Sequence, residues 1–342
     1  MIITKTPFRM SFFGGGTDFK PFFEEHGGKV ISTTFDKYSY AIVRHLPRFF
    51  DYRSQLTYSK IENVYSRDEF QHPLVREAMK FLNMDELHIT YDADLPARSG
   101  VGSSSAFAAG LLLAFHALKG QYISPKELAK EAIYLERELC DESGGWQDQI
   151  AVCYGGFNRI IFTGNDFFVS PLIMSNKRKE MLNDKLLLFF TGFSRFSSEI
   201  ATDHTNAIKS KKNDLLEMLK LCDEGEKILV SKSVSLDDFG KLLDYTWKLK
   251  RSITDKVSTG SLDEIYDKAK KAGAIGGKLM GSGGGGFFVF YVPEVKQPAV
   301  RSALSHLMNI PFKFDDKGAS VLYYQPEDFV FSESNQKERT KK

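Results

Sequence analysis

The segment Leu95-Pro-Ala-Arg-Ser-Gly-Val-Gly-Ser-Ser-Ser105 decides how the rest of the chain is interpreted. It follows a stretch, 87–94, that predicts a β-strand, and it precedes an apolar run, 106–119, that predicts a buried helix. The N-terminus of a helix presents unpaired N–H groups and the positive end of the helix dipole, which suit an anion. Gly100 and Gly102 let the backbone approach a phosphate group closely. The segment is therefore a candidate phosphate-binding loop.

Three consecutive serines end this loop and add hydroxyl groups for phosphate oxygens or a magnesium ion. They are Ser103, Ser104 and Ser105, and no carboxylate follows them within 106–110. The alternative interpretation is an ordinary helix cap in a flexible loop. The segment is not a P-loop, because no Lys-Ser or Lys-Thr pair follows a GxxxxG pattern.

A second glycine run, 281–286, matches the dinucleotide-binding pattern GxGxxG. That pattern must follow a strand and open a helix, whereas this run opens into the apolar segment 287–292, which predicts a strand. We therefore reject a dinucleotide site and expect a glycine-rich turn that packs against the phosphate loop.

The composition predicts a globular protein with a sizeable core. Of the 342 residues, 42% are hydrophobic and 26% are charged, and the net charge is only +2. This balance argues against nucleic-acid binding. The longest apolar stretch, 106–118, is too short to span a bilayer, and the 3 cysteines do not suggest a disulfide framework. We expect a soluble protein in the cytoplasm that binds neither nucleic acid nor membrane, as a monomer or a homodimer.

Periodicity predicts an α+β protein of two domains, with boundaries at 1–165 and 166–330 and a disordered tail at 331–342. The strands are expected at 2–13, 29–46, 87–94, within 157–190, and at 276–280, 287–292 and 320–324. The helices are expected at 106–119, from Pro125 onward, at 147–154, over most of 197–251, up to Ala269, and at 300–307.

Two carboxylates stand out on the predicted helices. Asp148 lies in the first turn of a helix, where the dipole favours the ionised form that a catalytic base requires. The alternative is that a first-turn aspartate only stabilises its helix. Glu136 falls between Ala129 and Ala132 on the helical wheel, at the flank of the apolar face. A carboxylate in that position is usually paired or bound to a metal.

Near the N-terminus, Arg9 and Asp18 flank the run Gly14, Gly15, Gly16 and Thr17. Glycines this dense leave room for a polyol, and the carboxylate of Asp18 could accept hydrogen bonds from sugar hydroxyl groups. The alternative is a turn between a strand and a helix, with Asp18 as the N-cap.

Together these segments resemble the GHMP small-molecule kinases. The segment 96–106 resembles the central PxxxGLGSSSA motif of that superfamily, with Val101 in place of leucine, and the segments 6–18 and 278–286 resemble its N- and C-terminal motifs. The resemblance implies a domain like domain 2 of ribosomal protein S5, followed by a ferredoxin-like domain. It also implies that ATP and the substrate bind in the cleft between them.

The resemblance also implies roles for individual residues. Asp148 would be the catalytic base and Arg9 would stabilise the deprotonating hydroxyl group, while Ser104 and Glu136 would bind Mg²⁺. The predicted ATP loop is Gly100, Val101, Gly102, Ser103, Ser104 and Ser105, supported by the glycine motif Gly281, Ser282, Gly283 and Gly284. The predicted substrate contacts are Arg9, Gly14, Gly15, Gly16, Thr17, Asp18, Trp146 and Asp148.

One departure from the galactokinase pattern narrows the expected substrate. Galactokinases carry a Glu-His pair where this chain has Gly15 and Gly16, and the missing side chains would widen the pocket. The Gly-Gly-Gly-Thr-Asp form resembles heptose-phosphate kinases and fucokinase-like relatives. The implied reaction is ATP-dependent phosphorylation of the anomeric hydroxyl of D-glycero-D-manno-heptose 7-phosphate, with Lys5, Arg44 and Arg98 as candidate contacts for the distal phosphate. Alternatives are another sugar 1-kinase or a sugar- and ATP-sensing protein without catalysis.

Overall fold

The computed structural model describes residues 1–47, 49–192, 210–252 and 257–326, and it has the expected α+β architecture of two sheets with helices. The expected tail at 331–342 and the start of the helical stretch at 197–209 lie outside the described residues. Among the described residues, no helix is both long enough and apolar enough to cross a membrane.

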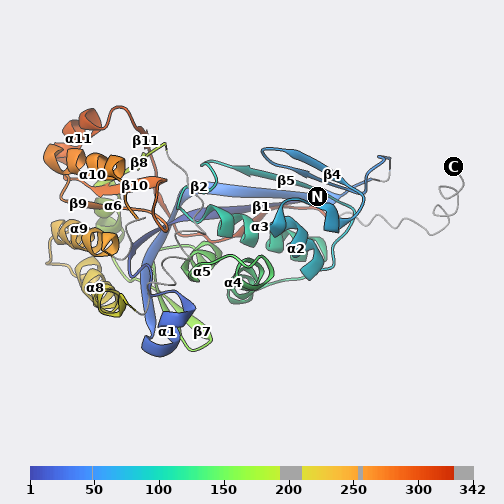
Figure 1. Ribbon diagram of the computed structural model, residues 1–342, viewed down its shortest axis with the longest axis horizontal. Coiled ribbons are helices and arrows are strands. Elements are labelled where there is room, and N and C mark those ends of the chain that lie inside the picture. Colours follow the sequence, from blue (N-terminus) through green and yellow to red (C-terminus); the bar gives the residue numbers. More distant parts are fainter. Residues whose placement is uncertain (48, 193–209, 253–256, 327–342) are drawn as a thin grey trace, which may run out of the picture.

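The first sheet is built on two long antiparallel strands, β1 (Ile2–Phe13) and β2 (Gly28–His45), which cross most of the molecule (Figure 1). Its main order is β13-β1-β2-β5-β3-β4, and β6, β7 and β12 join through β2. The remaining strands are β3 (Ser54–Thr57), β4 (Ile61–Val64), β5 (Leu87–Ala93), β6 (Asn158–Thr163), β7 (Asp166–Pro171), β12 (Phe314–Asp315) and β13 (Ser320–Tyr324).

Helix α3 (Ser103–Leu118) contacts β1 and β2 directly, and it also packs against α4 and α5. Its sequence is apolar on all sides, so nearly every residue is buried. The other helices of this part are α1 (Lys20–His26), α2 (Pro73–Phe81), α4 (Pro125–Tyr134) and α5 (Gln147–Tyr154). The expected capping box starts α4, because Ser124 and Glu127 satisfy each other's backbone N–H groups.

The second sheet has the order β11-β8-β10-β9, which is the order expected for a ferredoxin-like domain. Its strands are β8 (Leu186–Phe190), β9 (Gly276–Leu279), β10 (Phe287–Tyr291) and β11 (Met308–Ile310). Its helices are α6 (Asn176–Asp184), α8 (Lys212–Val230), α9 (Asp237–Arg251), α10 (Gly260–Ala272) and α11 (Gln297–Ala303). They surround the sheet at one end of the molecule (Figure 1).

Alternate residues of β10 point to opposite faces of the second sheet and enter different cores, so both faces of this sheet are buried. Phe287, Val289 and Tyr291 join the large core that includes the first sheet. Phe288 and Phe290 join a second core together with Trp247 of α9. The two halves of the molecule therefore share one continuous core, which fixes their relative position.

The structure corrects several details of the sequence interpretation. Strands β7, β12 and β13 pair within the first sheet, so the segment 166–330 also contributes to that sheet. The segment 176–184 is a helix and not a strand, because the hydroxyl of Ser175 accepts a hydrogen bond from the backbone of Arg178 and caps it. Helix α3 begins at Ser103, three residues before the predicted start. The elements α2, β3 and β4 were not predicted.

Candidate active site

The predicted phosphate loop ends at the N-terminus of α3, with all three serines in the first helical turn. Gly102 is the N-cap, with a φ angle of 77° that favours glycine. The Ala106 N–H donates to the carbonyl of Gly102, so the N–H groups of residues 103–105 have no intrahelical acceptor. The first turn holds no acidic residue and no side-chain cap. These donors are therefore arranged to bind an anion.

The second glycine run forms a turn that packs on this loop, as expected. A Cβ atom on Gly281 would lie 2.5 Å from the Cα of Gly100, and one on Gly100 would lie 2.5 Å from the carbonyl oxygen of Met280. Further along, a Cβ atom on Gly286 would lie 2.1 Å from the carbonyl oxygen of Ser99. Only glycines allow the two backbones to approach this closely, and the run leads into β10 and not into a helix.

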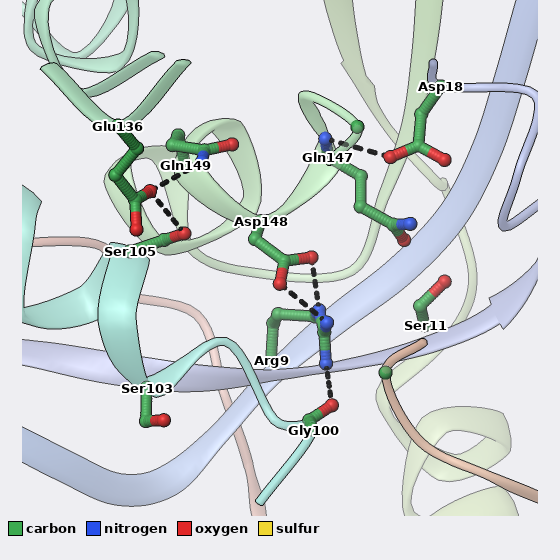
Figure 2. A network of polar contacts seen from close by, with 12 residues as sticks. Arg9, Ser11, Asp18, Gly100, Ser103, Ser105, Glu136, Gln147, Asp148 and Gln149 are labelled. Carbon is green, nitrogen blue, oxygen red and sulfur yellow. Dashed lines mark hydrogen bonds and ion pairs between the residues drawn. The ribbon is translucent and has the colours of Figure 1, made fainter. Parts of the chain in front are cut away.

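Arg9 connects the phosphate loop to Asp148 (Figure 2). Its Nε and Nη2 atoms donate to the two carboxylate oxygens of Asp148 at 2.7 and 2.6 Å, and Nη1 donates to the carbonyl of Gly100 at 2.5 Å. The Arg9 side chain is buried, whereas that of Asp148 is 24% exposed. Asp148 lies beside the loop, since a Cβ atom on Gly102 would be 3.7 Å from its Oδ2 atom. The structure therefore brings together the predicted base, its arginine and the phosphate loop.

Glu136 is buried, as predicted, but its serine partner is Ser105 and not Ser104. The Ser105 hydroxyl donates to the Glu136 carboxylate at 2.7 Å, and the amide of Gln149 also donates to it (Figure 2). Ser104 is exposed on the first turn of α3. Glu136 lies in a π-helical turn, Leu135–Leu139, that continues α4. Such turns are frequent at functional sites.

Most residues of the N-terminal glycine turn, 14–18, are buried. The hydroxyl of Thr17 donates to the carbonyls of Gly14 and Lys29. The Asp18 carboxylate is 1% exposed and accepts hydrogen bonds from the backbone N–H groups of Gly16, at 2.8 Å, and Gln147, at 3.3 Å. Burial raises the pKa of Asp18. Asp18 therefore anchors the start of α5, which carries Asp148, and it does not cap α1, whose N-cap is Phe19.

Trp146, a predicted substrate contact, takes part in the same anchor. Its backbone N–H donates to the Asp18 carbonyl at 3.1 Å, and its ring packs edge-on against Phe23, with 4.8 Å between the ring centroids. Gly15 differs from the other residues of the turn, because it is half-exposed and a Cβ atom there would make only ordinary contacts.

Two buried lysines of the second half of the chain were not predicted. Lys278 Nζ donates to the carbonyls of Ser11 and Phe12 in β1, at 2.7 and 3.3 Å. Lys250 Nζ donates to the carbonyls of Leu279 and Gly281. Burial, and then the positive charge of Arg9, lowers the pKa of Lys250 to about 8, while burial lowers that of Lys278. Within the described residues, neither lysine forms a salt bridge with a carboxylate.

The three basic residues proposed for a distal phosphate are less well placed. Arg44 lies opposite His88 on β2, ten residues beyond Thr34, the partner of Arg9. That separation is roughly 30 Å along a strand, so Arg44 does not belong to this site. Lys5 lies over the ring of Tyr38, and Arg98 is an exposed residue of the phosphate loop itself.

The site combines a helix N-terminus that can bind phosphates with a neighbouring carboxylate and arginine. On this two-domain fold, that combination is typical of a small-molecule kinase. Family models agree: the N-terminal domain of GHMP kinases matches residues 73–156, and the C-terminal domain of GHMP kinases matches residues 231–310. The chain belongs to the GHMP kinases. It is an enzyme that transfers a phosphoryl group to an alcohol acceptor, and among these kinases it is a sugar kinase.

Several relatives are kinases of sugars or sugar phosphates. The chain is 31% identical over 319 residues to D-glycero-alpha-D-manno-heptose 7-phosphate kinase of Campylobacter jejuni, covering 89% of this chain and 93% of that protein. It is 28% identical to the L-fucokinase/L-fucose-1-P guanylyltransferase of Bacteroides fragilis, but covers only 23% of it. The structure of a D-glycero-D-manno-heptose 1-phosphate kinase from Bacteroides thetaiotaomicron matches with a TM-score of 0.70 and 26% identity, over 95% of this chain and 100% of that one.

Proposed function

We propose that the protein uses ATP to phosphorylate the anomeric hydroxyl of D-glycero-D-manno-heptose 7-phosphate, giving the 1,7-bisphosphate. The product would supply the synthesis of nucleotide-activated heptose for surface glycans, in the cytoplasm. One observation carries the proposal: Arg9 binds both the Asp148 carboxylate and the carbonyl of Gly100 in the phosphate loop. The heptose-phosphate kinase of Campylobacter jejuni supports the choice of sugar.

In this mechanism the chain positions two substrates and moves one proton. The free N–H groups at the start of α3 bind the phosphates of ATP. The Asp148 carboxylate accepts the proton of the anomeric hydroxyl, and the Arg9 guanidinium stabilises the alkoxide that forms. Because Arg9 contacts both Asp148 and the loop, it aligns the acceptor oxygen with the phosphate to be transferred.

Residues beside the loop fit a magnesium ion. Glu136 is a buried carboxylate that makes no salt bridge within the described part of the chain, and the hydroxyl of Ser105 donates a hydrogen bond to it. Described residues form no cluster of three or more acidic, histidine or cysteine ligands. This suits Mg²⁺, which usually takes one or two carboxylates together with substrate phosphates. Glu136 and a serine of the first turn, Ser104 or Ser105, would hold it, and the bound ion would neutralise phosphate charge.

The charges around the acceptor side support an anionic substrate. Arg9 supplies one cation, and Lys250 and Lys278 supply two more when they are protonated, whereas Asp18 and Asp148 supply at most two anions. Burial raises the pKa of Asp18 and lowers the pKa of both lysines, so it favours the neutral form of all three side chains. Buried lysines without carboxylate partners are costly unless a ligand compensates them. A sugar that already carries a phosphate would provide that negative charge.

A coupled assay of ADP release tests the proposal. The acceptors are D-glycero-D-manno-heptose 7-phosphate, L-fucose, D-galactose and mevalonate, each at several concentrations. We expect the highest kcat/KM with the heptose phosphate. A higher kcat/KM with an unphosphorylated hexose would refute the heptose assignment. Binding of sugar and ATP without any ADP release would instead indicate a sensor.

A further inference from the structure

Two buried polar side chains beside the catalytic pair have atoms that lack hydrogen-bond partners. The hydroxyl of Ser11 and the amide oxygen of Gln147 are both enclosed, and neither has a partner. Ser11 itself is only 4% exposed. An unsatisfied buried polar atom destabilises a protein, so each one requires an explanation. A substrate group that bonds to them is one such explanation.

The chain places these two side chains next to the catalytic pair. Ser11 follows Arg9 by two residues on β1, so both side chains point to the same face of the strand. Gln147 directly precedes Asp148 at the start of α5. Figure 2 shows the Gln147 amide extending toward the region of Ser11, beside the contact between Arg9 and Asp148.

The space next to both groups is the space in front of Gly15. A Cβ atom on Gly15 would lie 3.7 Å from the amide nitrogen of Gln147 and 3.9 Å from the hydroxyl of Ser11, with no other atom within 4 Å outside its chain neighbours. Gly15 is also half-exposed, unlike Gly14 and Gly16. The absent side chain thus leaves room for a small group beside the hydroxyl of Ser11 and the amide group of Gln147, whose nitrogen is the nearer of its two polar atoms.

We propose that Ser11 and Gln147 bind hydroxyl groups of the acceptor sugar next to the hydroxyl that Asp148 deprotonates. An amide oxygen accepts a hydrogen bond from a sugar O–H, and a serine hydroxyl can donate or accept, so the pair suits a polyol. A sugar whose hydroxyl groups reach these two side chains pairs their polar atoms, and a sugar lacking the matching hydroxyl leaves them unpaired. This inference rests on the proposed sugar acceptor.

The test uses the full-length protein and three variants: Ser11→Ala, Gln147→Leu and Gly15→Ala. Steady-state kinetics with D-glycero-D-manno-heptose 7-phosphate and ATP give a KM for each substrate, and calorimetry gives the affinity for the sugar without ATP. We expect each of the first two variants to weaken sugar binding about 2- to 10-fold, the effect of one lost hydrogen bond. The KM for ATP should change less than about 2-fold.

Gly15→Ala separates substrate binding from folding. Its new methyl group makes only ordinary contacts, and Gly15 lacks the positive φ angle that strains other residues, so the protein should keep its melting temperature. The methyl group nevertheless fills the space in front of Ser11 and Gln147, so the KM for the sugar should rise. The matched control is Thr6→Val, which removes another unpartnered buried hydroxyl on β1, one that faces Gly110 of α3. We expect it to leave both KM values unchanged.

Equal changes in the KM for sugar and for ATP, or no change in sugar affinity for all three variants, would overturn the inference. If the wild-type protein prefers another sugar of the panel, the heptose assignment fails, and the variants are measured with that sugar. A selective loss of its binding would then still support the roles of Ser11 and Gln147.

Discussion

At the scale of single residues, the central feature is the ion pair of Arg9 and Asp148. Both carboxylate oxygens accept hydrogen bonds from the guanidinium, so this pair fixes the position and orientation of the proposed base. The same guanidinium donates to the carbonyl of Gly100, so the proposed base and the proposed nucleotide site share one positioning residue.

Replacing Asp148 by asparagine should remove the base and leave the nucleotide site intact. We expect kcat to fall by at least about 10²-fold, the lower bound for losing a positioned base. The affinity for ATP, measured by calorimetry, should stay within a few-fold. Asp267→Asn, on the exposed side of α10, is the control. Near wild-type turnover in Asp148→Asn would show that another group takes the proton.

Lys250 should make sugar-phosphate binding depend on pH. Its pKa of about 8 means that the ammonium group is charged below that pH and neutral above it. The charged groups that act on it are Arg9, Asp18 and Asp148, and Lys278 is the nearby second lysine. If its charge attracts an anionic sugar, the KM for that sugar should rise as the pH increases through about 8.

The matched variant is Lys250→Arg, because arginine keeps its charge throughout this range. Its KM for the sugar phosphate should stay level where that of the wild type rises. Identical pH profiles for the two proteins would remove Lys250 from the binding of the acceptor.

Sequence reasoning singled out residues whose motifs are local, such as Asp148 and the phosphate loop, and the structure places them close together through Arg9. It did not identify Lys250 or Lys278, because their partners are backbone carbonyls contributed by other strands and turns. Nor did it identify Ser11 and Gln147. These residues stand out only because a buried polar atom of each lacks a hydrogen-bond partner, which a sequence cannot show. It predicted that Glu136 lies at the edge of the apolar face of a regular α-helix. In the structure Glu136 is buried, and it lies in a π-helical turn instead.

At the scale of elements, the site depends on the contact between two turns. The start of α3 carries the proposed phosphate donors, and the glycine turn before β10 packs on it without any side chain between them. Sequence predicted this contact correctly from the strand that follows the glycines. It did not predict α2, β3 or β4. It also missed the early start of α3, because serine is common both in loops and at helix starts.

Gly281→Ala should disturb this contact. The new methyl carbon would lie 2.5 Å from the Cα of Gly100, at a φ angle of 72°. Overpacking and backbone strain together should lower the free energy of unfolding by about 2–4 kcal/mol, and the displaced loop should raise the KM for ATP. Urea unfolding and ATP kinetics measure the two effects.

Gly120→Ala is the control for backbone strain alone. Gly120 also has a positive φ angle, 68°, but nothing lies within 4 Å of its added Cβ atom. It should cost about 1 kcal/mol and leave the KM for ATP unchanged. Equal effects of the two substitutions would mean that the contact between the turns is unimportant.

At the scale of the whole molecule, the two halves form one packed unit around the site. Phe239 of α9 packs edge-on against Phe12 and Phe13 of β1, with ring centroids 5.2 Å apart in each pair. The first half supplies the phosphate loop, Arg9 and Asp148, and the second half supplies the glycine turn and the two lysines. The sequence predicted two domains, but it could not show that the C-terminal strands β12 and β13 return to the first sheet, because strand pairing at this distance leaves no local pattern.

The central claim is that this assembly phosphorylates an anomeric hydroxyl with Asp148 as the base. Phosphorus NMR of a reaction containing ATP and D-glycero-D-manno-heptose 7-phosphate tests it most directly. We predict a sugar product with two phosphates, the new one coupled to the anomeric proton, formed by the wild type in step with ADP. A new phosphate on any other carbon, or ADP formed without a phosphorylated sugar, would contradict the account.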